Sequence, residues 1–184
     1  MKPALAPLLA LLLVSSAARA DFIVTATLTG DQQVPPNASP AVGFAALTYE
    51  SASGELAYVI SFGGLSGDLA AAHIHFGSAG TTGPVILPFV IPPGTGTDGA
   101  LVGLLTAADF IAAPGGPASF ADALVAIQAG ETYVNLHTPN FPDGEIRGQL
   151  SEFVAVPEPA GLVLLGLGGL AVGALAARRR PAGV

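Results

Sequence analysis

Residues 131–153 read ETYVNLHTPNFPDGEIRGQLSEF and contain two segments in which apolar and polar side chains alternate. Because successive side chains of a β-strand point to opposite faces, this pattern predicts one strand over 131–137 and a second over 145–153. The residues between them, 138–144, include two prolines and a glycine and are expected to form the connecting loop. Each strand should then send its apolar side chains to a core and its polar ones to the other face.

The same alternation recurs in earlier segments that end at glycine- or proline-rich turns, and it predicts strands over 21–29, 42–50, 55–62, 69–76 and 85–91. The last of these is expected at a sheet edge, because Pro88 cannot donate a ladder hydrogen bond. Two short helices are expected after residue 105, with Thr106 and Ser119 as their N-caps. This order of elements favours a mostly β protein, an antiparallel β-sandwich with a short helical insertion.

The first twenty residues have the three parts of a secretory signal peptide. Lys2 supplies the positive charge, and residues 4–14 form an apolar run that is too short to span a bilayer, which needs about 20 residues. The run is followed by Ala18-Arg19-Ala20, a typical cleavage site. We therefore expect export and cleavage between Ala20 and Asp21, with a buried N-terminal helix as the alternative.

The C-terminal segment, 155–184, ends in the pattern of a membrane anchor. A proline-rich start is followed by the uncharged apolar residues 160–177 and then by Arg178, Arg179 and Arg180. Eighteen residues fall at the short end of the membrane-spanning range of about 17–25. Because the arginines should stay cytoplasmic, we expect a C-terminal transmembrane helix with the domain outside. A core helix of the soluble domain is the alternative.

Between these ends the chain is strongly acidic. Residues 21–156 contain twelve acidic residues and one basic residue, Arg147, which gives a formal net charge of −11. This charge excludes nucleic acid as a partner, since phosphate binding depends on Lys and Arg, and it favours cations and basic proteins. The chain has no cysteine, so no disulfide can support the domain, and its stability must come from a packed core.

All three histidines of the chain fall in predicted strands. His73 and His75 are two residues apart in one strand and therefore share a face, while His137 ends another. If these strands and the 145–153 strand are neighbours, one polar face collects six side chains: His73, His75, Asn135, His137, Glu145 and Arg147.

This predicted patch has two interpretations. In the first, His73, His75 and His137 bind zinc or copper and leave a coordination position open for water or substrate, as in a metal-binding and redox-capable protein. In the second, the histidines and Asn135 hydrogen-bond backbone groups beside the 138–144 loop, while Glu145 and Arg147 form an ion pair. A His-x-His pair by itself does not decide between them.

Arg147 is expected to pair with a carboxylate, Glu145 and Asp143 being the nearest in sequence, and ligand binding is its alternative role. The domain contains no lysine, no Gly-x-Ser-x-Gly motif and no phosphate-binding loop. No catalytic residue is therefore assigned, and a binding role is expected rather than an enzymatic one.

Six motifs along the chain resemble those of the CHRD (chordin-type) domain. They are LTGDQQVPP (28–36), GFA (43–45), AHIHFG (72–77), GPV (83–85), AGETYVNLHT (129–138) and GEIRGQL (144–150). The resemblance runs from Asp21 to about residue 153, and we place the domain at 21–154. It implies an immunoglobulin-like β-sandwich and no catalytic residue.

The segment His73-Ile74-His75-Phe76-Gly77 is also similar to the copper-ligand strand of the copper–zinc superoxide dismutases, which are Greek-key β-sandwiches. That similarity implies His73, His75 and His137 as copper ligands. The chain differs in lacking the further histidines that bind zinc and the disulfide.

The segment 155–184 resembles a PEP-CTERM sorting signal, with its motif at Pro157, Glu158 and Pro159, an apolar helix over 160–177 and an arginine cluster at 178–180. Such a signal implies a Gram-negative bacterium and an exosortase as processing enzyme. We therefore expect an exported surface or extracellular-matrix binding module, made as a membrane-anchored precursor, whose surface ligand is unknown. A copper- or zinc-binding protein is the alternative.

Overall fold

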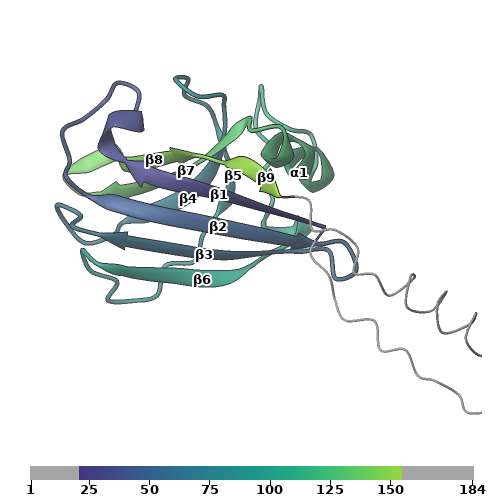
Figure 1. Cartoon of the computed structure of the whole chain (residues 1–184), viewed down its shortest axis with the longest axis horizontal. Helices are drawn as coiled ribbons and strands as arrows, with labels where there is room; N and C mark the ends of the chain where they lie inside the picture. Colours follow the sequence, from purple (N-terminus) through teal and green to yellow (C-terminus); the bar gives the residue numbers. More distant parts are fainter. Residues whose placement is uncertain (1–20, 155–184) are drawn as a thin grey trace, which may run out of the picture.

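The computed structural model of the chain describes residues 21–154 (Figure 1). The predicted leader with Ala20 and the predicted sorting segment, including the apolar residues 160–177, lie outside the described residues. Among the described residues, no helix has the length and apolar character needed to cross a membrane.

The described part is mostly β and holds the following elements: β1 (Phe22–Thr29), η1 (Gly30–Gln32), β2 (Val42–Glu50), β3 (Glu55–Gly63), β4 (Ala71–Phe76), β5 (Val85–Pro88), β6 (Gly99–Leu105), η2 (Ala107–Asp109), α1 (Phe120–Gln128), β7 (Thr132–Thr138), β8 (Phe141–Gln149) and β9 (Ser151–Val154). The mostly β prediction with a short helical insertion is confirmed.

The strands form one antiparallel sheet in the order β5-β4-β7-β8-β1-β2-β3-β6, with β9 beside β1. Its two halves meet at β1, where Thr29 pairs with Arg147 of β8. Figure 1 shows β2, β3 and β6 on one side of the molecule and β4, β7 and β8 on the other. The predicted pair of separate sheets is therefore replaced by a single sheet that curves around the core and is nearly barrel-shaped.

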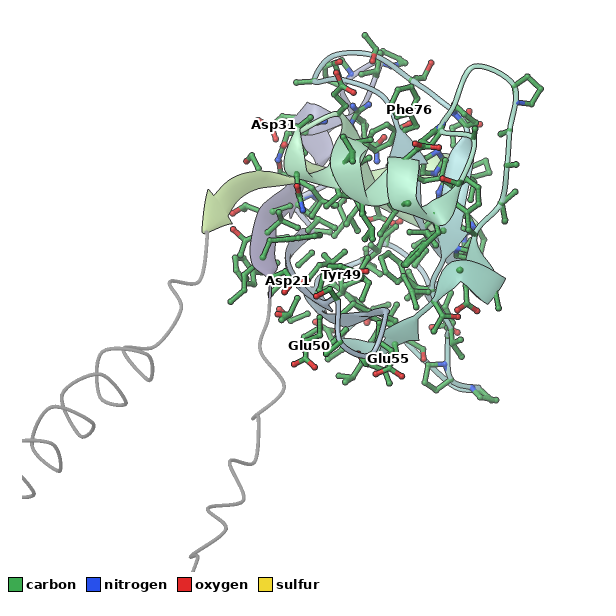
Figure 2. The ribbon with its side chains drawn as sticks, turned by 90° about the vertical axis from the view of Figure 1, so that its right-hand side faces the viewer. Asp21, Asp31, Tyr49, Glu50, Glu55 and Phe76 are labelled. Carbon is green, nitrogen blue, oxygen red and sulfur yellow. The ribbon has the colours of Figure 1, made fainter. Side chains whose placement is uncertain are left out.

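The core follows from the alternation seen in the sequence. On β3, for example, Leu56, Tyr58 and Ile60 are buried, while Val59 between them is half exposed. Helix α1 begins at its N-cap Ser119 and buries apolar side chains at one end of the sheet: Phe120, Ala123, Leu124 and Ile127. In Figure 2 the apolar side chains fill the interior and the labelled acids Asp31, Glu50 and Glu55 lie at the outside.

Most predicted elements are confirmed, and three predictions need correction. The predicted strand over 145–153 is two strands, because β8 ends at Gln149 and β9 begins at Ser151 beside β1. Strand β6 was not predicted, because Gly99 and Gly103 interrupt its apolar pattern. The predicted 138–144 loop is wrong, since β8 already begins at Phe141 and Thr138 pairs with Phe141 across a tight turn. Pro88 does lie in an edge strand, β5, and Thr106 caps η2 through a capping box with Asp109.

Candidate metal centre

Strand register places the three histidines on one face of the β4–β7 pair. His73 lies opposite Asn135, His75 opposite Tyr133, and Ala71 opposite His137. The residues between them, Ile74 and Val134, are fully buried in the core. The imidazoles consequently project from the side of the sheet that faces away from the core.

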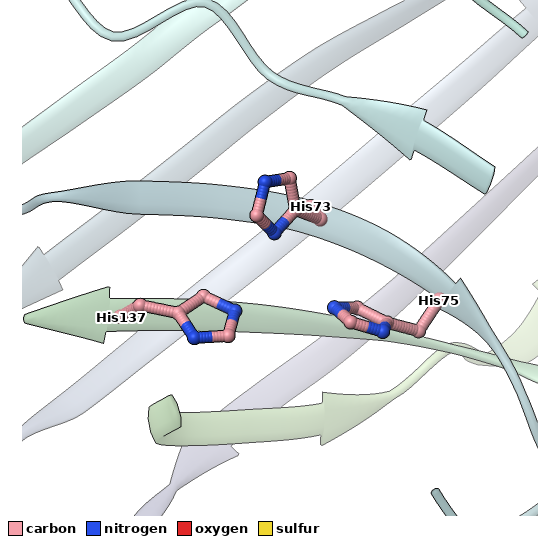
Figure 3. Close-up of side chains that lie close together, drawn as sticks. All are labelled: His73, His75 and His137. Atoms are coloured by element: carbon pink, nitrogen blue, oxygen red, sulfur yellow. The ribbon is translucent and has the colours of Figure 1, made fainter. Parts of the chain in front are cut away.

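The three rings converge on one point in space (Figure 3). One ligand nitrogen from each of His73, His75 and His137 lies within 4.8 Å of the other two. Ring centroids are 5.2 Å apart for His73 and His137, and 5.6 Å for His73 and His75. In Figure 3 each ring turns one nitrogen toward the space that the rings share.

Backbone carbonyls fix the protonation of two rings. The Nδ1 atom of His75 lies 2.9 Å from the carbonyl oxygen of Gly83, and that of His137 lies 2.9 Å from the carbonyl oxygen of Pro142. A carbonyl oxygen only accepts hydrogen bonds, so each Nδ1 must carry the proton and donate it. In the neutral ring the Nε2 atom then bears a free lone pair.

Those free nitrogens are the unsatisfied atoms of the site. His75 Nε2, His137 Nε2 and His73 Nδ1 are all buried and have no hydrogen-bond partner among the described residues. Buried polar atoms without a partner are uncommon in folded proteins and need a physical reason. Here three of them meet at one place and supply the lone pairs that a transition metal would take.

Electrostatics keep the rings neutral. Burial lowers the pKa of His73 from 6.5 to about 4, and repulsion from the two other imidazoles adds to this effect. Burial also lowers the pKa of His75 and of His137, against the opposing effect of their carbonyl hydrogen bonds. Neutral imidazole is the form that binds metals, so near neutral pH the site is already deprotonated.

The geometry fits a small transition-metal ion. Three atoms that are mutually within 4.8 Å share a point no more than about 2.8 Å from each of them, against a Zn–N distance of about 2.0–2.1 Å. Small rotations of the rings, which move each nitrogen by less than about 1 Å, would close this difference. The rings themselves are only partly buried, and a metal held by three protein ligands would keep a coordination position for water or substrate.

Tyr133 and Arg147 form the next layer beside His75. The Tyr133 ring stacks on His75 with centroids 4.9 Å apart, and the Arg147 guanidinium carbon lies 3.4 Å from the centroid of the same Tyr133 ring. The Tyr133 hydroxyl accepts a hydrogen bond from the Gly83 backbone N–H. Residue Gly83 is thus held by both the tyrosine and the histidine.

The predicted carboxylate partner of Arg147 is wrong. The guanidinium donates instead to the carbonyl oxygens of Thr81 and Ser78, at 2.7 and 3.1 Å, and to the side chain of Gln149. Arg147 is only 2 % exposed. Backbone carbonyls of the 78–81 loop therefore take the role that the sequence suggested for an acid.

The other two predicted patch residues have separate surroundings. Asn135 accepts from the Gln33 side chain at 2.7 Å and donates to the carbonyl of Asp143. Glu145 is fully buried and accepts from Ser39, Ser66 and Thr138 at 2.6–2.8 Å. The β7–β8 ladder shifts its register between Leu136 and Thr138, next to the segment that holds Glu145. Glu145 thus anchors the loops that contain Ser39 and Ser66, and it does not take part in the histidine cluster.

Burial raises the pKa of Glu145, but the hydrogen bonds from Thr138, Ser39 and Ser66 outweigh this effect and lower the pKa overall. The carboxylate therefore stays ionised in the folded protein. Its partners come from three separate segments, which Glu145 ties together at one end of the sheet.

Sequence reasoning missed the residues that orient the rings. Gly83 and Pro142 act through their carbonyl oxygens, which any residue possesses, so residue type gave no signal. Alternation along 131–137 does put Tyr133 on the same face as Asn135 and His137, but the predicted patch does not include it.

Comparison with known families gives two matches. The CHRD domain matches residues 24–150, and the PEP-CTERM protein-sorting motif matches residues 155–180. No curated protein and no solved structure matches the chain.

Proposed function

The chain belongs to the CHRD domain family, and we propose that it is an exported surface or matrix module whose working part is a zinc or copper centre. The ligands are His73, His75 and His137. The observation that carries this proposal is the convergence of three buried imidazole nitrogens that have no hydrogen-bond partner within the described part of the chain.

The groups behind the rings support a metal more strongly than a hydrogen-bond network. A purely structural role would be expected to use both nitrogens of each ring, yet the carbonyls of Gly83 and Pro142 engage only Nδ1 and aim Nε2 at the shared point. Carbonyl groups behind ligating imidazoles are a common feature of metal sites, where they fix the tautomer and the ring orientation.

Bound zinc or copper would supply Lewis acidity, or redox chemistry in the case of copper, at its open coordination position. The residues of the chain hold the rings neutral, orient them and shield one side of the centre. No side chain of the described residues is assigned to act on a substrate.

Delivery rests on the sorting motif. The PEP-CTERM match implies an exported, envelope-associated protein that an exosortase processes. To this we add the finer proposals: a signal peptide cleaved at Ala20–Asp21, a transmembrane helix over 160–177 in the precursor, and an immunoglobulin-like, Greek-key ancestry for the curved sheet. After the exosortase cleaves the precursor near Pro157, the domain is either retained at the cell surface or released to the matrix.

The test is the metal content of the exported protein, purified after growth with zinc and copper, for the original chain and for His75→Asn. The asparagine amide can still donate to Gly83 near the position of Nδ1, but it has no Nε2 lone pair. We expect close to one metal ion per chain in the original protein and a loss of most of it in the variant.

Thr27→Ala, on the exposed face of β1, serves as the matched control and should keep its metal. A metal-free original chain, or equal metal in the original and His75→Asn proteins, would refute the centre. The domain would then be a surface module without metal.

A further inference from the structure

Strand β6 is an open sheet edge. It ends the strand order, and within residues 21–154 its only strand partner is β3, with Val59 opposite Val102. Among the described residues, no backbone hydrogen bond from a turn or loop reaches the stretch 99–105. Figure 1 shows β6 at the outer border of its half of the sheet. Its outward N–H and C=O groups are therefore free to pair with another strand.

The edge lacks the usual protection. Residues 99–105 read GALVGLL, with no charge and no proline, although exposed edges are normally blunted by lysine, proline or a cover. The opposite edge differs, because β5 contains Pro88 and its Ile86 carbonyl accepts a hydrogen bond from the Ile111 N–H. Of the two edges that end the described strand order, β6 is thus the one fit for pairing.

The outer face beside this edge is apolar. Val102 is 71 % exposed, Leu104 55 % and Val59 50 %, and they adjoin one another on β6 and β3. Large contiguous exposed apolar surfaces are common at interaction sites. This one is free of charge in a domain whose net charge is −11, so a second, equally acidic copy would meet the least repulsion here.

We propose that two copies of the chain pair through β6, antiparallel, with the two-fold axis at Val102. In this register Val102 lies opposite its own copy and Ala100 lies opposite Leu104, so that every outward pair within 99–105 is apolar and uncharged. The two curved sheets become one continuous sheet. The contact is isologous, as in most soluble dimers, and it is independent of the metal centre.

The absence of cysteine from the natural chain gives a direct test. Val102→Cys is introduced into the full chain, exported with its own signals, and the envelope fraction is treated with the thiol oxidant diamide. Directly opposed residues have Cβ atoms about 4.5–5.5 Å apart, close to the range that a disulfide needs. We expect a disulfide-linked dimer of doubled mass on a non-reducing gel, with or without a chelator.

Position and register are tested by further single cysteines. Val59→Cys, similarly exposed but one strand further in, should remain monomeric. Leu104→Cys should also remain monomeric, because residue 104 would lie four residues, or about 13 Å, from its copy. The double variant with both Ala100→Cys and Leu104→Cys should cross-link, because residue 100 of one copy lies opposite residue 104 of the other. Absence of the dimer at position 102, or equal cross-linking at 59 and 102, would overturn the proposal.

Discussion

At the scale of single residues, the centre depends on which nitrogen of each imidazole carries the proton. The carbonyls of Gly83 and Pro142 each take an Nδ1 proton and leave the Nε2 lone pairs of His75 and His137 facing His73. His73 contributes the third nitrogen that lacks a partner among the described residues, its Nδ1. Three lone pairs without donors would be destabilising in an empty fold, and a bound cation would satisfy all of them together.

The first prediction at this scale concerns pH. Burial lowers the pKa of His73 to about 4 and lowers that of His75 and His137 in the same direction. Between pH 6.5 and about 4 the unfolded chain therefore binds more protons than the folded one. We expect the free energy of unfolding of the metal-free protein to fall as the pH falls through this window, and these groups to have no effect above it.

Chemical denaturation in the presence of a chelator, at a series of pH values, measures this dependence. The variant His73→Asn should show a shallower slope, because it removes the histidine whose pKa is lowered to about 4. Identical slopes in the original protein and the variant would show that His73 is not held neutral by burial.

At the scale of elements, the β7–β8 hairpin supplies His137 and its carbonyl partner, next to His73 and His75 of β4. Its turn is tighter than the sequence suggested, and this tightness brings the Pro142 carbonyl to His137 and the Asp143 carbonyl to Asn135. Gly144 makes the approach feasible, because it has a φ of 124° and its position leaves no room for a Cβ beside the Asn135 and Gln33 side chains.

Gly144→Ala is therefore expected to destabilise the protein by more than the roughly 1–3 kcal/mol of an unfavourable φ alone, and to weaken metal binding by displacing Pro142. Gly54→Ala is the matched control, since Gly54 also has a positive φ, of 72°, but no described residue other than Gly54 and its two chain neighbours lies within 4 Å of the place that a Cβ would occupy. Thermal unfolding of both variants, with and without zinc, gives the comparison. Equal losses of stability would contradict the steric argument.

The elements were predicted best where side chains alternate strictly. Strands β1, β2 and β3 and the caps of η2 and α1 follow from local pattern and agree with the structure. Strand β6 was missed because its glycines hide the alternation, although pairing with β3 along seven residues makes it a regular strand. The position of β6 depends on its pairing with β3, and the local sequence of β6 carries no information about that partner.

The site was predictable as far as the alternation of side chains along each strand determines it. Alternation put His73, His75 and His137 on one face, and register then brought them together. The partners of Arg147 were not predictable, because the Ser78 and Thr81 carbonyls come from a loop whose path depends on tertiary packing. Glu145 lies apart from the histidines for a similar reason, since its partners Ser39 and Ser66 are far away in the sequence.

At the scale of the whole molecule, the single curved sheet presents two different surfaces, one with the histidines and one that is apolar. One half of the sheet, β4-β7-β8, presents the histidines, and the other half, β2-β3-β6, presents the uncharged apolar face. A negative domain attracts divalent cations to its surroundings, while three neutral imidazoles would favour a transition metal over calcium or magnesium, which prefer oxygen ligands.

X-ray absorption spectroscopy of the exported protein, at the edge of whichever metal it retains, reports on the ligands of the proposed centre themselves. We expect three imidazole nitrogens around the metal, at about 2.0–2.1 Å if the metal is zinc, and one imidazole fewer in His137→Ala. A protein that retains no metal, or a metal surrounded by oxygen atoms without imidazole, would show that the three histidines do not form a metal centre.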